Sequence, residues 1–206
     1  MRVTVVDYGM GNLRSVAKAL ETVGFKEVLV SPDAEAVSSS FAVVFPGQGA
    51  FRKAMENLKN LSLIRPLREH IEKGRPFLGI CLGLQLLFER SYEHGETEGL
   101  GVLKGEVVLL PTKVKIPHMG WNQVWIKQKE GLFSNINEGD FFYFVHSYHV
   151  VPEDKEVIAS TTDYGEDFVS AIQVENLWAV QFHPEKSQSK GLQVLRNFRK
   201  LCESLA

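Results

Sequence analysis

The first half of the chain alternates short apolar runs with stretches in which apolar residues recur every three or four positions. The short runs have the length and composition of buried strands, and we expect strands at Val3–Val6, Val28–Val30, Phe41–Phe45 and Phe77–Ile80. The amphipathic stretches predict helices at Asn12–Val23, Ala50–Leu58 and Leu63–Glu72, with Gly74 as the residue that ends the last one. Strands and helices in alternation favour a parallel sheet with right-handed crossovers.

After Gly95 the pattern changes to β-branched and aromatic runs separated by turn residues. These runs predict strands, mostly antiparallel, at Gly101–Leu110, Gly120–Ile126, Phe141–Val151, Val157–Thr162, Phe168–Gln173 and Leu177–Phe182. A last helix is expected to begin at Ser187–Gly191 and to bury Cys202 on its apolar face. The whole pattern predicts an α/β fold with a doubly wound, mostly parallel central sheet flanked by helices, and additional antiparallel strands in the second half.

Composition narrows the class of protein. A length of 206 residues fits a single domain over 1–206, and a net charge of −2 disfavours nucleic acid as a partner. The apolar stretch at the N-terminus is too short for a signal peptide, and no run approaches the ~20 residues of a membrane span. The two cysteines form neither a disulfide framework nor a metal-binding spacing. We therefore expect a cytoplasmic protein without a membrane association or a metal site.

One candidate nucleophile stands between two glycines. The segment Gly79-Ile-Cys-Leu-Gly83 follows a predicted strand and has the glycine spacing of a nucleophile elbow. A sharp turn from strand to helix forces strained backbone geometry and close neighbours, which glycines on both sides tolerate. A following helix would present the amide of Leu82 and its positive end to the sulfur of Cys81. The alternative is that Cys81 is a small buried apolar residue.

A cysteine nucleophile needs a base, and the base needs an orienting partner. His183 ends a predicted strand and is followed by Pro184, which stops the strand, and by Glu185. Residues two apart in extended chain point to the same side, so Glu185 can reach one ring nitrogen while the other faces the sulfur. The other histidines are interpreted as structural: His70 on a surface helix, His94 in a loop, His118 in an irregular stretch, and His146 and His149 in an aromatic strand.

The first turn of the chain suggests a different kind of site. Asp7-Tyr-Gly-Met-Gly-Asn-Leu-Arg14 begins like a dinucleotide-binding fingerprint, but Arg14 stands where the third glycine belongs. Asp33, at the place of a ribose-binding acid, follows Pro32 in what is expected to be a loop. The other interpretation is a tight turn in which Asn12 caps the next helix. A nucleotide-binding module therefore stays open as an alternative, although the missing third glycine counts against it.

Three ordered segments carry a resemblance to a known family. Pro46-Gly-Gln-Gly49, Gly79-Ile-Cys-Leu-Gly-Leu-Gln85 and Gln181-Phe-His-Pro-Glu185 resemble the motifs of the class I (triad) glutamine amidotransferases, over nearly the whole chain. The resemblance implies the fold of that class and a glutaminase that hydrolyses L-glutamine to glutamate and ammonia through a cysteinyl acyl-enzyme, with no cofactor. Cys81, His183 and Glu185 would form the catalytic triad.

The same resemblance implies roles for residues around the triad. Backbone amides of Leu82 and of Gly47 or Gln48 would form the oxyanion hole, although Gln48 stands where the family is expected to have an apolar side chain. The substrate would be held by Gly49, Gln85, Glu93, Ser147 and Tyr148. For Glu93 the alternative is a solvated charge in a loop.

Ammonia released into water at neutral pH would mostly become protonated, so its production has to be coupled to a consumer. Pro117-His-Met-Gly-Trp-Asn122, Tyr143-Phe-Val-His-Ser-Tyr148 and the first turn resemble the branch of the family whose members supply a separate (β/α)₈ cyclase of histidine biosynthesis. The resemblance implies a heterodimer whose interface or gate includes Asn12, His118, Met119 and Trp121. Trp121 as a core aromatic residue is the alternative.

Two other enzyme assignments remain open at this stage. The elbow and the His-Pro-Glu segment are shared by the glutaminases of other amidotransferases, so these two motifs do not identify the acceptor. A cysteine amidase or peptidase of related fold would also use such an elbow.

Overall fold

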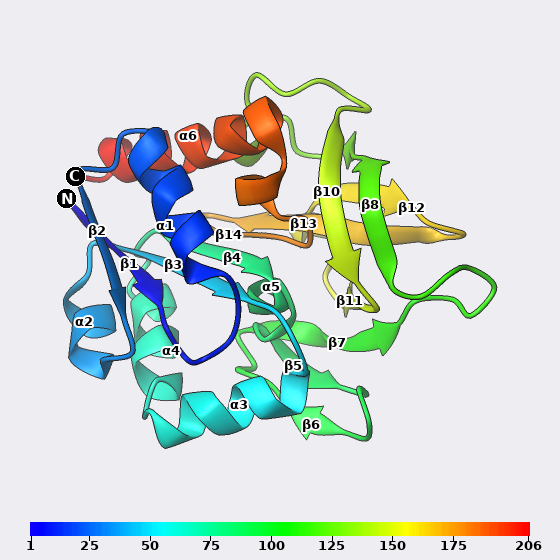
Figure 1. Ribbon diagram of the computed structural model, residues 1–206, viewed down its shortest axis with the longest axis horizontal. Helices are drawn as coiled ribbons and strands as arrows, with labels where there is room; N and C mark the ends of the chain where they lie inside the picture. Colours follow the sequence, from blue (N-terminus) through cyan, green and yellow to red (C-terminus); the bar gives the residue numbers. More distant parts are fainter.

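The computed structural model describes residues 1–206, and an eight-stranded sheet forms its centre (Figure 1). The strands, in their order across the sheet, are β2 (Glu27–Ser31), β1 (Arg2–Val6), β3 (Ala42–Gly47), β4 (Phe77–Cys81), β14 (Leu177–Val180), β13 (Asp167–Val174), β12 (Ile158–Asp163) and β9 (Trp125–Ile126). The first five strands are parallel, and β13, β12 and β9 continue the sheet in antiparallel pairing. The predicted α/β class and its mostly parallel central sheet are therefore confirmed.

Helices cover both faces of this sheet (Figure 1). The helices are α1 (Leu13–Thr22), α2 (Ala34–Ser39), α3 (Phe51–Asn60), α4 (Ile64–Glu72), α5 (Leu82–Gln85) and α6 (Gln188–Ser204), and single 3₁₀ turns are η1 (Gly131–Phe133), η2 (Lys155–Val157) and η3 (Pro184–Lys186). Apolar residues of α1 and α6 pack on one face of the sheet, and those of α2, α3 and α4 pack on the other. None of the helices has both the length and the apolar composition that crossing a bilayer requires.

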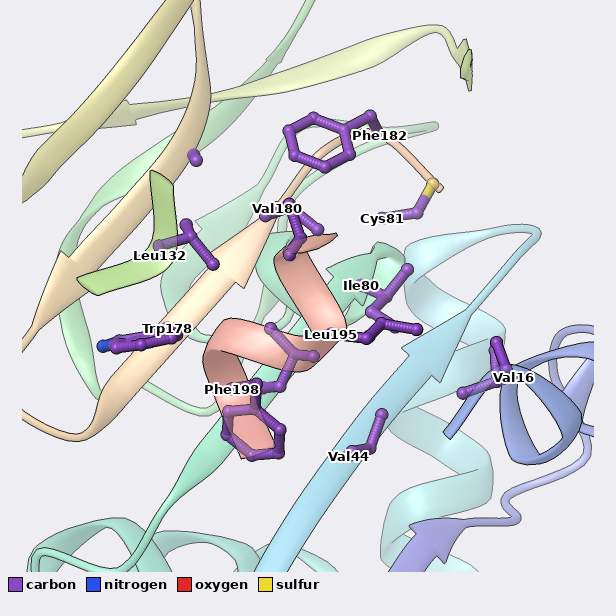
Figure 2. Packing of buried hydrophobic residues seen from close by; sticks show 14 of the residues in the cluster. Val16, Val44, Ile80, Cys81, Leu132, Trp178, Val180, Phe182, Leu195 and Phe198 are labelled. Atoms are coloured by element: carbon purple, nitrogen blue, oxygen red, sulfur yellow. The ribbon is translucent and has the colours of Figure 1, made fainter. Parts of the chain in front are cut away.

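The core on the α1 and α6 face shows how strand alternation builds the protein. Figure 2 shows Leu195 and Phe198 of α6 turned toward the sheet residues Val44, Ile80 and Trp178. The alternate residues of the same strands, such as Phe45 and Phe77, belong to the second core on the opposite face. Strands buried on both sides read as continuous apolar runs, which is why their positions are visible in the sequence.

Two smaller sheets are formed by strands between Phe88 and Pro152. One contains β11 (Tyr148–Pro152), β7 (Leu103–Leu109), β5 (Phe88–Ser91) and β6 (Thr97–Glu98), and the other pairs β10 (Phe141–His146) with β8 (His118–Gln123). The predicted strand over Phe141–Val151 is thus two strands, because the chain leaves one sheet at Ser147 and enters another.

Two short elements were not predicted. Asp33 lies in a loop, as expected, and α2 begins directly after it; the helix after the elbow is a single turn that gives way to strand β5. The run at Leu177 pairs antiparallel with β13 but parallel with β4. Short apolar segments do not reveal their partners, so pairing direction is decided only by the assembled sheet.

Two of the histidines interpreted as structural are buried. His70 lies on the partly exposed helix α4, as predicted, and faces inward, with Nε2 3.1 Å from the carbonyl oxygen of Pro76. Burial lowers the pKa of His70 to about 4. His118 is the first residue of β8 and is buried as well, not part of an irregular stretch.

Candidate active site

Parallel register brings the segments of the candidate site together. β4 lies between β3 and β14, with Gly47 of β3 paired with Cys81 and Val180 of β14 paired with Ile80. The carboxyl ends of the three strands therefore meet at one edge of the sheet. This edge is where ligands gather in open α/β sheets.

The turn at Cys81 has the geometry expected of an elbow. Cys81 adopts φ 55° and ψ −108°, a backbone conformation that residues other than glycine rarely adopt. A Cβ atom on Gly83 would lie 1.8 Å from the carbonyl oxygen of Phe45, and one on Gly79 would lie 2.9 Å from the Cβ of Ala179. Both glycines are thus required by close backbone packing. Strain of this kind costs about 1–3 kcal/mol and tends to persist at functional sites.

His183 and Glu185 form a buried pair. Nδ1 of His183 donates to Oε1 of Glu185 at 2.8 Å, and both side chains are almost inaccessible to solvent. Pro184 begins the turn η3 directly after His183, which folds Glu185 back beside the ring. The amide of His183 donates to the carbonyl oxygen of Tyr143 on β10, which fixes the segment from the other side. With Nδ1 occupied, Nε2 is the nitrogen left for the sulfur.

Charge at this site favours a protonated imidazole. Burial by itself lowers the pKa of His183, but the thiolate of Cys81 and the carboxylate of Glu185 outweigh burial and raise this pKa to about 10. Nε2 nevertheless has no hydrogen-bond partner of good geometry. Cys81 and His183 therefore interact through their charges, without an aligned hydrogen bond.

The sulfur of Cys81 has two polar neighbours besides His183. It lies 3.8 Å from the carbonyl oxygen of Val145 and 3.5 Å from Nε2 of Gln181. Cys81 is 5% exposed, and its sulfur stands at the rim of the core beyond Ile80 (Figure 2). The second cysteine, Cys202, is fully buried on α6 with its pKa raised by burial to about 12. Its predicted place in the core is therefore confirmed.

A cavity of about 420 Å³ opens beside the sulfur, and its size is that of a small-molecule site. Eight of the candidate residues line it, namely Gln48, Gly49, Cys81, Leu82, Gln85, Glu93, Ser147 and Tyr148. Four lining residues that sequence reasoning did not place in the site are Ala50, Pro117, Val145 and His146. The triad partners of the cysteine and Gly47 do not line the cavity. They lie behind the sulfur, where they can act on it without blocking entry.

Glu93 is the only acidic residue in the cavity wall. Its Oε2 accepts a hydrogen bond of 2.7 Å from the amide of Phe51, at the first turn of α3. A carboxylate at a helix N-terminus is favoured by the exposed amides there. Burial, followed by the charge of Glu93, raises the pKa of Tyr148 across the cavity. Glu93 thus lies half-buried in a turn with a backbone partner, which supports a place in the site over a freely solvated charge.

Tyr8 packs behind Gly47. A Cβ atom on Gly47 would lie 2.0 Å from the Tyr8 hydroxyl, so only glycine fits at this position. The hydroxyl is buried without a hydrogen-bond partner, and burial, followed by the charge of Cys81, raises the pKa of Tyr8 well above its usual value. Asn57 donates to the Tyr8 carbonyl at 2.9 Å and holds the turn against α3.

Of the four candidate interface residues, three are exposed and His118 is buried. Met119 and Trp121 project from the same side of β8 and are 62% and 47% exposed, so Trp121 is not a core aromatic residue. His118 is on the opposite side of the strand and only 3% exposed. Asn12 is exposed at the end of the first turn, and its side chain accepts a hydrogen bond of 3.3 Å from the amide of Ser15. The predicted helix cap at Asn12 is confirmed.

His118 belongs to a chain of hydrogen bonds that ends in the cavity wall. Nδ1 of His146 lies 2.8 Å from the Tyr148 carbonyl oxygen, which only accepts, so this nitrogen donates. Burial lowers the pKa of His146 to about 3 and that of His118 to about 4, which keeps both rings neutral. Nε2 of His146 therefore accepts, at 3.0 Å, from Nδ1 of His118. Nε2 of His118 in turn accepts from Asn122 at 3.2 Å.

Three residues near the site were missed because their contacts are not local in the chain. Gln181 lies within a recognised motif, but its contact with the sulfur follows from the pairing of β4 with β14. His146 enters the cavity wall because β10 ends beside it, and Tyr8 is buried by the turn that crosses β3. Only the motif around Gln181 offered a signal in the sequence.

Comparison with known proteins adds an independent result. Residues 4–201 match the profile of the family described as "Glutamine amidotransferase class-I". A protein of Aquifex aeolicus named "Imidazole glycerol phosphate synthase subunit HisH" is 63% identical over 205 residues, which cover 100% of this chain and 99% of that protein. A protein of the same name from Moorella thermoacetica is 51% identical, with 97% of this chain and 94% of that protein covered.

Solved structures with lower identity share the fold. PurLQS from Thermotoga maritima aligns with a TM-score of 0.74 at 18% identity, over 99% of this chain and 98% of the matched chain. A putative GMP synthase protein from Thermoplasma acidophilum aligns with a TM-score of 0.73 at 19% identity, over 100% and 95% of the two chains. At these identities the likeness concerns the arrangement of helices and strands alone.

Proposed function

Because the chain belongs to the class I glutamine amidotransferase family, we propose that it is the glutaminase subunit of an imidazole glycerol phosphate synthase. The observation that carries the proposal is the strained elbow at Cys81, with the His183–Glu185 pair behind the sulfur and a cavity in front of it. The name of the two relatives that align over nearly their full length supports the choice of synthase. We further propose that residues 1–206 act as one glutaminase domain.

In the proposed reaction the Cys81 thiolate attacks the side-chain amide carbon of L-glutamine. The C–S bond forms while the carbonyl π electrons move to oxygen, which gives a tetrahedral oxyanion. Protonated His183 then donates its Nε2 proton to the departing nitrogen. The oxyanion electrons re-form the carbonyl and the C–N bond breaks, so that neutral ammonia leaves and a thioester remains. The raised pKa of His183, about 10, supports its role as the acid in this step.

Hydrolysis of the acyl-enzyme completes the cycle. His183, neutral after giving up its proton, takes a proton from water as the water attacks the thioester carbon. The C–S bond breaks, the new carboxylic acid gives its proton to solvent and leaves as glutamate, and the protonated ring again faces the thiolate. Glu185 keeps Nδ1 protonated throughout, since its carboxylate accepts from that nitrogen at 2.8 Å.

Backbone amides are proposed to stabilise the oxyanion. Leu82 follows the nucleophile, and Gly47 is paired with Cys81 on the neighbouring strand, with Gln48 next to it in the cavity wall. The amide of Leu82 and that of Gly47 or Gln48 are our candidates for the two donors. A donor of this kind typically contributes about 2.7–4 kcal/mol to transition-state stabilisation. A backbone role is insensitive to the polar side chain at Gln48.

The cavity wall suggests how the substrate is held. The carboxylate of Glu93 would face the ammonium group of glutamine, and the backbone at Ser147 and Tyr148 would face its carboxylate. Gln85 lies one turn beyond Cys81, and together with Gly49 it would contact the bound glutamine beside the sulfur. These roles remain predictions.

The acceptor of ammonia is proposed to be a separate (β/α)₈ cyclase, bound as a heterodimer in the cytoplasm. β8 and β10 present an exposed face that includes Met119, Trp121 and Phe141. Val145 of β10 also lines the cavity, so this face continues to the place where ammonia would be released. A contiguous exposed apolar face of this kind is typical of a protein interface. Asn12 and the first turn would contribute at the same side.

The proposal is tested by separating the two half-reactions. Cys81→Ala should abolish imidazole glycerol phosphate formation from glutamine when the chain is combined with the cyclase, while synthesis from added ammonium salt continues. The matched control is Cys202→Ala, which removes the other thiol from the core and should retain glutamine-dependent activity. Loss of both half-reactions in Cys81→Ala, or retention of both, would reject the proposed division of labour.

A further inference from the structure

Gln181 is a buried polar residue to which the proposed mechanism assigns no role. Its side chain is inaccessible to solvent and is absent from the cavity wall, yet Nε2 lies 3.5 Å from the sulfur of Cys81. Its Oε1 accepts a hydrogen bond of 3.1 Å from Nε2 of Gln85. The backbone amide of Gln181 is bonded to the carbonyl of Ser170 on β13 at 2.8 Å, so the residue is anchored at both ends.

The hydrogen-bond partners decide which end of the Gln181 amide faces the sulfur. Nε2 of Gln85 also donates to the carbonyl oxygen of Tyr148, at 2.9 Å. This carbonyl only accepts, so the Gln85 amide must present its NH₂ group, and its second hydrogen points to Gln181. Gln181 must present its oxygen to the NH₂ group of Gln85, because two NH₂ groups facing each other would both be donors. Its own NH₂ group is thereby directed at the sulfur.

The two polar neighbours of the sulfur thus interact with different protonation states of Cys81, one with the thiol and the other with the thiolate. A thiol can donate its hydrogen to the Val145 carbonyl, which lies 3.8 Å away. A thiolate has no hydrogen to donate and gains instead the hydrogen bond from Gln181. A donor that bonds only to the charged form of a group stabilises that form.

We propose that Gln181 is a further catalytic residue, whose amide stabilises the Cys81 thiolate while Gln85 sets the direction of that amide. The inference rests on the proposed function, and it deepens the account of the same site. Gln181 acts before the attack, when the sulfur carries its charge, and again when the sulfur leaves the thioester. Because Tyr148 is part of the cavity wall, the amide pair also ties the sulfur to the place where substrate is bound.

Alkylation of Cys81 by iodoacetamide, followed from pH 5 to 10 without glutamine, measures thiolate formation directly. The experiment uses Gln181→Met, which keeps the length of the side chain and removes the donor, in a Cys202→Ala background. A hydrogen bond to a charged group is worth roughly 1.5–3 kcal/mol, which corresponds to a rate lower by about tenfold or more near neutral pH. The midpoint of the pH profile should move up by about one pH unit.

Gln181→Glu should move the midpoint further than Gln181→Met, because a carboxylate beside the sulfur repels the thiolate. Gln85→Met leaves Gln181 in place but frees its amide to turn, and it should move the midpoint in the same direction. The matched control is Thr162→Val, which removes a fully buried hydroxyl without a partner elsewhere in the same sheet. It should leave the alkylation profile unchanged.

Steady-state kinetics with the cyclase provide the second readout. Gln181 is sealed from the cavity, so Gln181→Met should lower kcat by about tenfold or more and change KM by less than about threefold. An alkylation profile that moves in neither Gln181→Met nor Gln85→Met would overturn the inference while leaving the proposed function intact. Glutamine hydrolysis by Cys81→Ala would instead reject the proposed function itself.

Discussion

At the scale of single residues, the geometry around Cys81 is maintained by contacts that leave no room for side chains. Its φ of 55° is stabilised from both sides, because Gly79 lies against Ala179 and Gly83 lies against the carbonyl of Phe45. A strained nucleophile costs about 1–3 kcal/mol, which the surrounding packing must supply. The elbow is therefore sensitive to the smallest possible additions of volume.

Gly83→Ala should disturb the elbow more than it disturbs the rest of the fold. The new Cβ would lie 1.8 Å from a backbone oxygen, so the strand or the turn has to move. We expect a loss of about 1–3 kcal/mol in the free energy of unfolding by urea, together with a loss of most glutaminase activity. Gly74→Ala is the control, since Gly74 has φ 66° and open space around it. It should cost about 1 kcal/mol and leave activity unchanged; equal effects of both variants on activity would contradict this account.

Glu185→Gln tests the second residue of the buried pair. Removing the carboxylate charge takes away part of what raises the pKa of His183 to about 10, so that pKa should fall. Since the acid in the proposed mechanism is the protonated ring, the alkaline limb of the kcat profile should move to lower pH. By analogy with other triads we expect kcat to drop by about two to four orders of magnitude, with KM little changed. NMR titration of the His183 ring checks the pKa, and an unchanged value would rule out this role for Glu185.

At the scale of elements, the two-stranded sheet of β8 and β10 separates two environments. One face carries the buried rings of His118 and His146, and the other carries the exposed side chains of Met119 and Trp121. Side chains alternate along a strand, so the same six residues of β8 serve both faces. The neutral histidine pair thereby joins the outer strand to the Tyr148 carbonyl in the cavity wall.

The buried histidines predict a loss of stability in acid. Above pH 6.5 both rings are neutral in the folded and in the unfolded chain. Below pH 6.5 the histidines of the unfolded chain become protonated, whereas in the folded chain His146 stays neutral down to about pH 3 and His118 down to about pH 4. Stability should therefore fall as the pH falls through this window, by about 1.4 kcal/mol per pH unit for each such group.

His146→Gln isolates one of these contributions. Between about pH 6.5 and 4, the slope of the unfolding free energy against pH should be smaller in the variant than in the unmodified chain, by the contribution of one titrating group. Its stability at about pH 8, where both rings are neutral, provides the baseline that separates this effect from lost packing. A slope equal to that of the unmodified chain would show that His146 is already protonated when folded.

At the scale of the whole molecule, the cavity and the exposed face of β8 and β10 lie on connected surfaces. Val145 and Pro117 border the cavity, while Met119 follows Pro117 by two positions and is the most exposed large apolar residue of the chain. A glutaminase whose product must not escape benefits from a partner bound over the exit of its cavity. The position of the face therefore agrees with the proposed heterodimer.

Trp121→Ala should weaken the proposed heterodimer. An aromatic residue that becomes buried at the centre of an interface typically contributes about 2 kcal/mol or more, so we expect the Kd for the cyclase to rise by about thirtyfold. The control is Trp125→Ala, because Trp125 is 41% exposed and lies on β9, in a different sheet from Met119 and Trp121. Calorimetric titration with the cyclase measures both; equal changes in Kd would mean that the interface lies elsewhere.

Much of the fold was predictable because its elements are encoded locally. The apolar strands of the first half, the cap at Asn12 and the amphipathic final helix each depend on neighbours in the chain, and the structure confirms them. The short helix α2 and strand β5 were missed, because segments of four to six residues carry too little periodicity. The site was predicted only as a set of residues. The glycine spacing and the His-Pro-Glu segment indicate which residues react, but they do not show which side chains contact one another.

The sequence by itself thus determined the alternation of strands and helices, the elbow at Cys81 and its resemblance to the class I glutamine amidotransferases. Only the tertiary structure decided which groups meet. The register between β4 and β14 places Gln181 against the sulfur, and the packing of β8 on β10 keeps His118 and His146 neutral. Pairing between distant strands and the desolvation of a ring are properties of the assembled core, so no local pattern in the chain could have specified them.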